Sequence, residues 1–367
     1  MTGDLGVGIV GASISGGWAL ESHIPAVLAT PGVALRAVST TRRATADASA
    51  QRFGARRAHT SAAALAADTD VGLVTVAVKV TKHFESVTAA LAARKDVYCE
   101  WPLGVNTQQA KILRDHAVLA GVRHIIGLQA RQQPAVRLLR ELVDGGRVGR
   151  VLAVHVLSAG MGHGAPVLAP GKEWVADERN GLSALTVRAA HTLDAVEFAV
   201  GRLAGILAKV GVATPKVAIE GENRWITKTA ADQVAIQGAL AGGATLSGLF
   251  VLGVHATGMP LMTVYGSEGT LEIVPDSPDG QIQMARLSLV ETRSSGERSV
   301  LPAPEEPPGA DGDPLAGPAA SVRRMYRAIA AGTSDGDVPD FDDAVRLHEL
   351  LDVIRRAAAT RCWQGVV

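Results

Sequence analysis

The chain has 367 residues, of which 47% are hydrophobic and 20% charged, a length and balance that predict a globular protein of two domains. Its 36 basic and 36 acidic residues cancel, so neither a nucleic-acid surface nor a polybasic membrane anchor is indicated. The two cysteines, Cys99 and Cys362, lack metal-ligand spacing and favour a reducing compartment. Without a secretory leader or an apolar run of roughly 18–20 residues, the sequence predicts a cytoplasmic protein with no metal site.

The first part of the chain alternates short apolar runs with helical patterns, as a doubly wound parallel sheet does. Strands are predicted at Leu5–Val10, Val33–Val38, Gly72–Val78, Asp96–Cys99 and Val122–Gly127. Helices are predicted up to about Leu28 and at Thr45–Phe53, which Gly54 ends, His83–Arg94 and Thr107–Ala120. This repetition predicts an α/β dinucleotide-binding Rossmann domain over residues 1–127.

The pattern changes after Leu128, where longer alternating segments predict an α+β domain with an open-faced, mostly antiparallel sheet over residues 128–340. Its strands are expected at Val151–Ser158, Leu203–Val212, Gln233–Leu240, Ala244–Leu252, Leu261–Tyr265, Thr270–Val274 and Gln281–Val290. Helices are expected at Arg137–Val143, Ser183–Ala199 and Ala319–Ala331, and an exposed loop at Ser294–Gly317. A last helix, Phe341–Ala358, and the tail to residue 367 are expected to pack back on the core, and Trp225 and Tyr265 to pack against the sheet.

A glycine-rich turn joins the first predicted strand to the first helix. Gly11-Ala12-Ser13-Ile14-Ser15-Gly16 matches the dinucleotide fingerprint G-x-G-x-x-G, with Ser13 in place of the middle glycine. Small residues there let backbone N–H groups approach a pyrophosphate at the positive end of the helix. A tight turn without a ligand is the alternative, but the strand–turn–helix context favours cofactor binding.

The second strand runs into Ser39, Thr40, Thr41, Arg42 and Arg43. A site for NAD(H) usually has an acidic residue here, which binds the ribose 2′-hydroxyl. Hydroxyls and arginines suit a 2′-phosphate instead, so the sequence predicts NADP(H), with NAD(H) as the other possibility. Alternatively, the two arginines only begin a solvated helix.

These stretches, and those that follow them, resemble the glucose–fructose oxidoreductase / inositol dehydrogenase family over almost the whole chain. Gly11–Ala19, Glu100-Trp101-Pro102-Leu103 and Gly127-Leu128-Gln129-Ala130-Arg131 are most similar to the subgroup of the yeast galactose-pathway repressor and its bacterial relatives. The resemblance implies a nucleotide-binding domain followed by an open-faced sheet domain. It also implies either hydride transfer on a sugar, polyol or related ring, or binding of the dinucleotide as a regulator.

The chain departs from the family at two catalytic positions. The family motif Glu-Lys-Pro here reads Glu100-Trp101-Pro102, and an indole cannot exchange a proton near neutral pH. Trp101 is expected to wall the nicotinamide or to stack on an apolar substrate face. The family aspartate one turn before the helical histidine is replaced by Val187, whereas His191 and the trailing Asp194 remain. His191 is thus the predicted acid/base, and a structural histidine is the alternative.

Other candidates follow the predicted strands or lie in the irregular segment before the His191 helix. Lys79 is expected either to supply the missing ammonium or to be a solvated loop residue, and Arg131 to bind substrate or to pair with an acid. Tyr98 is expected to pack rather than to relay protons. Lys172 and Trp174, with Trp101 and His191, are the predicted substrate contacts, and His255 is left open between the pocket and a subunit interface.

The sequence therefore predicts a cofactor site formed by Gly11, Ser13, Ile14, Gly16, Trp18, Ser39, Thr40, Arg42, Val78, His83, Glu100, Trp101, Pro102, Gln129 and Arg131. It predicts an NADP(H)-dependent oxidoreductase acting on a carbonyl, carbinol, imine or activated C=C of a small cyclic or sugar-like substrate. The alternatives are a dinucleotide-binding sensor without turnover and an enzyme that uses bound cofactor for transient redox. A homodimer or homotetramer through the C-terminal sheet is expected.

Overall fold

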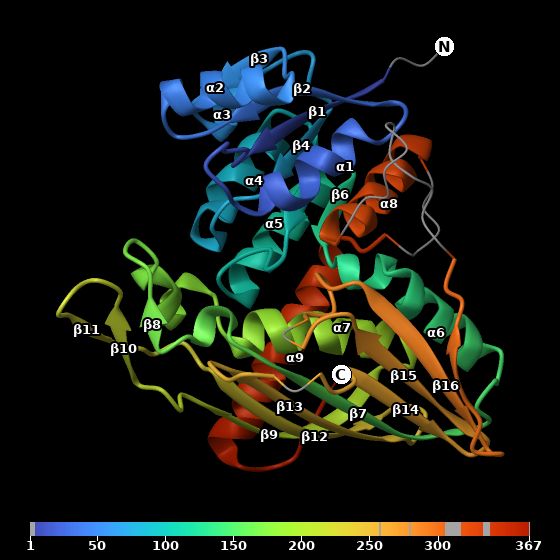
Figure 1. Ribbon diagram of the computed structural model, residues 1–367. Helices are drawn as coiled ribbons and strands as arrows, with labels where there is room; N and C mark the ends of the chain where they lie inside the picture. Colours follow the sequence, from blue (N-terminus) through green and yellow to red (C-terminus); the bar gives the residue numbers. More distant parts are fainter. Residues whose placement is uncertain (1–3, 257, 279, 305–316, 333–337, 367) are drawn as a thin grey trace. The chain divides into compact units, whose positions relative to one another are not determined.

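The computed structural model describes residues 4–256, 258–278, 280–304, 317–332 and 338–366. These residues form two compact units, one drawn from 1–132 and 306–348, the other from 133–305 and 349–367 (Figure 1). The fold class expected from the sequence is confirmed, since one unit contains a parallel sheet and the other a mostly antiparallel one. No described helix is long and apolar enough to cross a bilayer.

The first unit is built on a six-stranded parallel sheet in the order β3-β2-β1-β4-β5-β6. The strands are β1 (Leu5–Val10), β2 (Val33–Ser39), β3 (Arg57–His59), β4 (Leu73–Val76), β5 (Asp96–Glu100) and β6 (His124–Gly127). Apolar residues such as Val7, Ile9 and Val74 are fully buried because helices cover both faces of the sheet. The carboxyl ends of all six strands meet at one edge, where ligands bind in such sheets.

The helices of this unit are α1 (Ile24–Leu28), α2 (Arg43–Phe53), α3 (Ala62–Ala66), α4 (His83–Ala92) and α5 (Thr107–Ala120). A π-helical segment, Ala19–His23, leads directly into α1. Gly54, with a φ of 71°, ends α2 as a left-handed C-terminal residue, as the sequence predicts. Ser61 and Asn106 begin α3 and α5, and their side chains accept hydrogen bonds from backbone N–H groups of the first turn.

One helix from late in the sequence belongs to this unit. α8 (Pro318–Ala331) packs on α1 and on the π-helical segment, and Figure 1 shows it beside α1. Its residues Val322, Met325, Tyr326 and Ile329 join the same buried cluster as the strands of the sheet. The sequence assigns this helix to the second domain, because a pattern of apolar residues does not reveal which core they enter.

The second unit contains a nine-stranded sheet in the order β17-β16-β15-β14-β7-β13-β12-β9-β18. Its strands are β7 (Val151–Gly160), β9 (Leu203–Gly211), β12 (Gln233–Leu240), β13 (Thr245–Leu252), β14 (Met262–Gly266), β15 (Gly269–Pro275), β16 (Leu287–Arg293), β17 (Arg298–Leu301) and β18 (Gln364–Gly365). All pairings are antiparallel except that of β7 with β13. A separate small sheet joins β8 (Val167–Leu168), β10 (Lys216–Ile219) and β11 (Trp225–Thr227).

Helices cover one face of the large sheet. They are α6 (Pro134–Asp144) and α7 (Ala190–Ala199), which pack on each other, and a π-helical segment, Ala184–Ala189, which contacts β12 and β13. The helix α9 (Phe341–Thr360) begins in the first unit and ends in the second. Along β13, Leu246, Phe250 and Leu252 are buried whereas the alternate Leu249 is 42% exposed, so among the described residues the second face of the sheet is uncovered at this strand.

Three expectations about the second unit are wrong. Trp225 and Tyr265 do not pack against the sheet, since they are 65% and 44% exposed. The stretch predicted as one loop, 294–317, contains β17, and its residues 305–316 lie outside the described residues. The strand predicted from Gln281 begins at Leu287, because residues 281–286 form turns.

Candidate functional site

A cavity of about 370 Å³ lies in the first unit at the carboxyl ends of β1, β2 and β4. Most of the side chains around it are small or carry hydroxyls. The residues that line the cavity are Val10, Gly11, Ser13, Ser39, Thr40, Thr41, Arg42, Thr45, Thr60, Ser61, Ala62, Val78, Lys82, Glu85 and Ser86. Six of these residues, Gly11, Ser13, Ser39, Thr40, Arg42 and Val78, are predicted from the sequence as cofactor contacts, and the structure brings them together.

The glycine turn has a conformation that only glycine adopts freely. Gly11 has a φ of 96°, and a Cβ there would collide with the carbonyl oxygen of Ala77. Gly16 and Gly17 have φ values of 116° and 111°, and a Cβ on either would meet no atom within 4 Å. The backbone is therefore tightly packed where it leaves β1 and open where it approaches the helix, which leaves room for a ligand.

The amides of the turn are engaged within the turn and with α2. The Ser15 N–H donates to Ser13 Oγ at 3.1 Å, and the Ile14 N–H donates to Ser49 Oγ at 3.3 Å. Trp18 does not line the cavity, and its half-buried ring packs against the core of the unit. Ser13 and Ile14 thus lie where the fingerprint places them, while Trp18 contributes to packing.

Hydroxyl groups surround the end of β2, where an acidic residue would bind a ribose 2′-hydroxyl. Ser39 occupies that strand end, and the β3–α3 loop adds Thr60 and Ser61, which the sequence analysis does not identify. The only carboxylate on the cavity wall, Glu85, pairs with Lys82 at 3.2 Å. A run of hydroxyl residues before a short apolar helix is the signal that points to Thr60 and Ser61.

His83 connects the loops that follow β4 and β5. Its Nδ1 lies 2.7 Å from the carbonyl oxygen of Pro102, and its Nε2 lies 3.0 Å from that of Val78. The ring is 2% exposed, and burial lowers the pKa of His83 although both carbonyls and Glu100 act in the opposite direction. A neutral ring donates to one of these oxygens and so positions two loops that the sequence predicts to contact the cofactor.

A buried polar network lies behind the end of β5. His23 Nε2 is 2.8 Å from Glu100 Oε1, and His23 Nδ1 is 2.9 Å from the hydroxyl oxygen of Tyr326. That hydroxyl lies 2.7 Å from Thr75 Oγ1, and Gln129 Nε2 donates to Glu100 Oε2 at 3.3 Å. His23, Tyr326 and Thr75 are fully buried. The sequence does not point to these three residues, since no local motif links positions on the π-helical segment Ala19–His23, β4 and α8.

Trp101 and Arg131 are both buried in the first unit. Trp101 is 7% exposed, and its ring lies 4.6 Å from that of His348, measured between centroids. Arg131 Nη2 donates to Asp343 Oδ1 at 3.0 Å, which is the pairing with an acid that the sequence leaves open. Lys79, in contrast, is exposed on the loop after β4. Tyr98 donates to the sulfur of Met325 and packs in the core, as expected.

In the second unit, His191 and Asp194 lie on α7 and are 5% and 0% exposed. The preceding π-helical segment begins at Ser183, whose Oγ accepts from the Thr186 N–H. Arg188 attaches this segment to β7, because its Nη1 donates to Ser158 Oγ and to the carbonyl of Ala159. Such π-helical turns occur often at functional sites. Val187 is half-buried at the position where the family has an aspartate.

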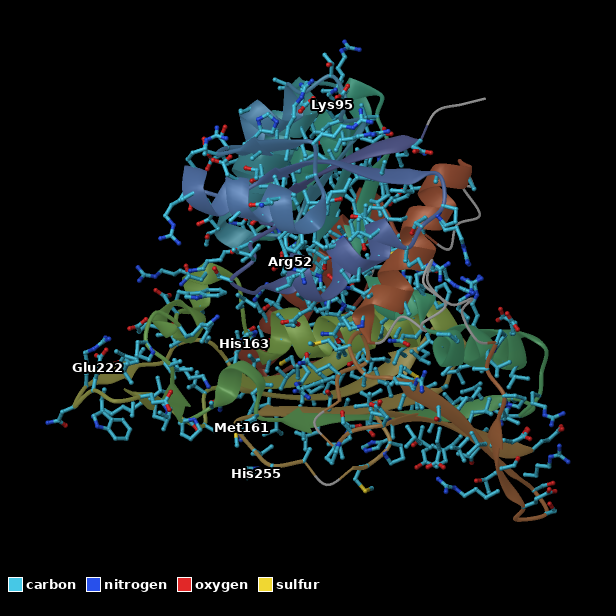
Figure 2. All side chains as sticks on the ribbon, turned by 45° about the horizontal axis from the view of Figure 1, so that its top comes forward. Arg52, Lys95, Met161, His163, Glu222 and His255 are labelled. Carbon is cyan, nitrogen blue, oxygen red and sulfur yellow. The ribbon has the colours of Figure 1, made fainter. Side chains whose placement is uncertain are left out.

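The irregular segment after β7 carries further candidate side chains, among them Met161 and His163 (Figure 2). Desolvation lowers the pKa of His163, and the charges of Lys172 and Arg188 act in the same direction. Lys172 is exposed, and Trp174 packs on the small core formed around Val175 and Val217. His255 is exposed beyond the end of β13.

The first unit fits a nicotinamide dinucleotide. The glycine turn provides an open cradle, the cavity offers hydroxyls, and the 1% exposed Gln129 has an amide oxygen with no partner among the described residues. Leaving a buried acceptor unsatisfied is costly, and a donor from a ligand or an ordered water would satisfy it. The described residues contain no group of three His, Cys, Asp or Glu side chains that could hold a metal ion.

Comparisons with known proteins agree with this geometry. Residues 5–128 match the model of the oxidoreductase family with an NAD-binding Rossmann fold, and residues 134–274 match that of the Gal80p C-terminal domain. Dehydrogenase aclE of Aspergillus oryzae is 33% identical over 183 residues, 49% of this chain and 48% of that protein, so this match spans about half of the relative.

Two further matches extend over the whole chain. Levoglucosan dehydrogenase of Pseudarthrobacter phenanthrenivorans is 24% identical, with 99% of this chain and 98% of that protein covered. The crystal structure of a super-repressor mutant of Gal80p from Saccharomyces cerevisiae has a TM-score of 0.86 and 22% identity, with 99% of this chain and 98% of that one covered. Residues 5–128 are therefore similar to the NAD-binding Rossmann domain of this oxidoreductase family, and residues 134–274 to the C-terminal domain of Gal80p.

Proposed function

We propose that the chain is an NADP(H)-dependent oxidoreductase that transfers a hydride between nicotinamide and a carbonyl, carbinol, imine or activated C=C. The observation that carries this proposal is the cavity at the ends of β1 and β2, with its glycine turn and hydroxyl-rich wall. The bound dinucleotide would supply the hydride, and the protein would bind and orient it and exclude water. A small cyclic or sugar-like substrate is supported by the similarity to levoglucosan dehydrogenase.

NADP(H) is favoured over NAD(H) by the charges around Ser39. No carboxylate is present at the end of β2, whereas Arg42 lines the cavity. An arginine binds a phosphate through charge-assisted hydrogen bonds, and an absent carboxylate removes the usual partner of a free ribose 2′-hydroxyl.

This preference is tested by fluorescence titration with NADPH and NADH. The wild-type protein is expected to bind NADPH at least ten times more tightly, about 1.4 kcal/mol. Arg42→Gln is expected to remove most of that ratio. Arg43→Gln is the matched control, since Arg43 is engaged by Asp47 and by the carbonyl of Ala58. Equal affinity of the wild-type protein for both dinucleotides would contradict the preference.

We infer that His191 exchanges the proton with the substrate in place of the family lysine, and that Asp194 helps to orient it. An imidazole can exchange a proton with a substrate, whereas the indole of Trp101 at the lysine position cannot. Lys79 is a second candidate for this role. His191→Gln is expected to lower kcat by about 10²-fold or more while NADPH affinity stays unchanged. A kcat that stays within a factor of three of the wild-type value would exclude His191, and Lys79→Met would then be tested.

The alternative is a dinucleotide-binding sensor without turnover. It is favoured by the burial of Trp101 against His348, where the family motif has its lysine, and by the Gal80p type of the second domain. Single-turnover oxidation of bound NADPH by a panel of cyclic ketones, lactones, sugars and imines separates the two functions. NADPH binding without oxidation by any of them would favour the sensor.

We propose that copies of the chain associate through the uncovered face of the nine-stranded sheet. A shallow hollow of about 520 Å³ lies on this face, between side chains such as His155, Leu207 and Leu249. Leu207 and Leu249 are 39% and 42% exposed, which is typical of a surface covered by a partner. Leu249→Lys is expected to shift the mass in light scattering from dimer or tetramer to monomer, and a wild-type monomer would contradict the proposal.

A further inference from the structure

The carboxylate of Glu100 is buried but fully provided with donors. Glu100 is 8% exposed, and each of its two oxygens has its own donor, His23 Nε2 at 2.8 Å and Gln129 Nε2 at 3.3 Å. A Cβ on Gly127 would lie 2.6 Å from Glu100 Oε2, so the carboxylate fits only because glycine ends β6. Burying a carboxylate is costly unless it is hydrogen-bonded, and here both of its oxygens have a donor.

A carboxylate only accepts hydrogen bonds, so the bond between His23 and Glu100 has one direction. His23 Nε2, 2.8 Å from Glu100 Oε1, is the donor. On the other side of the ring, Nδ1 lies 2.9 Å from the Tyr326 hydroxyl oxygen, which lies 2.7 Å from Thr75 Oγ1. These buried partners hold the ring in place, as outer partners orient histidines at other sites. His23 is therefore held as a donor to the carboxylate.

The position of the network connects it with the cofactor. Glu100 ends β5 and Gln129 follows β6, so both lie at the carboxyl edge of the parallel sheet. Gln129 gives its amide N–H to Glu100, which leaves its buried Oε1 without a partner among the described residues. The opposite amide orientation would set two oxygens against each other. Gln129 Oε1 and the Glu100 carboxylate together suit the nicotinamide of a bound dinucleotide. Its carboxamide N–H could donate to Oε1, and its ring is positively charged when oxidised and would be attracted to the carboxylate.

We propose that Glu100, held by His23 and Gln129, makes the site favour the oxidised, cationic nicotinamide over the reduced, neutral one, and that His23 is a positioning residue for this charge. This inference rests on the dinucleotide site of the proposed function. It assigns a role to the glutamate of the Glu100-Trp101-Pro102 tripeptide that does not depend on the missing lysine.

The test compares the dissociation constants of the oxidised and the reduced dinucleotide, with NADP⁺/NADPH or NAD⁺/NADH, whichever pair the wild-type protein binds more tightly. Glu100→Gln keeps the shape of the side chain and removes its charge. It is expected to lower the preference for the oxidised form about tenfold, about 1.4 kcal/mol. Loss of affinity for both forms by one factor, or no loss, would overturn the role of the charge.

Two substitutions of His23 test the positioning role. His23→Gln places an amide N–H near the position of Nε2. It is expected to keep the ratio of the affinities for the oxidised and the reduced dinucleotide within a factor of two of the wild-type value. His23→Asn places its amide near Nδ1 instead and so removes the donor to Glu100. It is expected to lower this ratio at least threefold. Equal behaviour of the two variants would overturn this role.

Ser22→Ala is the matched control on the same helix, because the buried Ser22 hydroxyl donates only to the carbonyl of Trp18 one turn earlier. The ratio is expected to be unchanged in this variant, and a change as large as that of the Asn variant would overturn the specific role of His23. If the His23 variants fail to fold, Glu100→Gln alone decides on the charge. A wild-type protein that binds neither pair would refute the proposed function itself, whereas an unchanged ratio in a binding protein refutes only this inference.

Discussion

The hydroxyl oxygens of Thr75 and Tyr326 lie 2.7 Å apart in the interior of the first unit, although the two residues are 251 positions apart in the sequence. Thr75 belongs to β4 and Tyr326 to α8, so one contact connects the centre of the parallel sheet with a helix from late in the chain. Burial raises the pKa of Tyr326, and its hydroxyl therefore stays protonated and able to donate.

Tyr326→Phe is expected to lower the free energy of unfolding by about 1–3 kcal/mol, because Thr75 and His23 both lose a buried partner. Urea unfolding followed by circular dichroism measures the difference. Thr30→Val is the control, since the buried Thr30 hydroxyl, just after α1, donates to the carbonyl of Ala26 in that helix. A loss in Tyr326→Phe no larger than that of the control would show that the contact contributes little.

Folding stability is expected to fall as the pH decreases below about 6.5, and His83 is expected to contribute to this fall. The pKa of His83 is lowered in the folded protein, chiefly by burial. Between the folded and the unfolded pKa the unfolded chain then binds more protons, so acid favours unfolding in that window. Urea unfolding at pH 8, 7, 6 and 5.5 should show a smaller loss in His83→Gln than in the wild-type protein. Identical pH profiles of the two proteins would contradict the shift.

The two cysteines are expected to react at very different rates with a thiol reagent. Cys99 is fully buried, and burial together with the charge of Glu100 raises the pKa of its thiol well above the usual range. Cys362 is exposed. Because the thiolate is the reactive form, the native protein should show one fast thiol, which Cys362→Ser removes. A fast thiol that remains in that variant would be Cys99 and would mean that β5 opens readily.

Gly11→Ala is expected to abolish dinucleotide binding and to destabilise the first unit by more than Gly54→Ala does. Both glycines have positive φ angles, 96° and 71°, but only at Gly11 would a Cβ meet a backbone carbonyl. The angle alone costs about 1–2 kcal/mol for a residue with a Cβ, which is the loss expected at Gly54. Thermal unfolding of both variants measures the difference. Similar melting temperatures would show that the turn relaxes around the added methyl group.

The sequence predicts those parts of the fold that are determined by the residue pattern of short segments. The glycine turn, the alternation of apolar strands with helices and the left-handed Gly54 are properties of short segments, and the structure agrees with them. Contacts between distant segments are not encoded in this way. His23, Thr75 and Tyr326 were therefore not identified, and α8 was assigned to the second domain.

The residues of the candidate site likewise divide into those that local sequence patterns predict and those that they do not. Ser39, Thr40 and Arg42 follow a recognisable strand, whereas Thr60 and Ser61 precede a helix of only five residues that the periodicity does not reveal. Trp225 was expected to be buried because it is large and apolar, but it lies on β11 of a small three-stranded sheet that leaves it exposed. Hydrophobicity predicts burial only where a second layer is available to cover the residue.

The pairing of β18 with β9 covers part of one edge of the nine-stranded sheet. Gln364 and Gly365 lie opposite Ile206 and Gly205, and Val366 donates a further backbone hydrogen bond to Ala204. Among the described residues this short strand is all that covers the outer edge of β9, whose free N–H and C=O groups would otherwise offer a template to a strand of another molecule. A two-residue strand offers little template of its own. β18 thus covers part of this sheet edge, and its loss would favour aggregation of otherwise folded molecules.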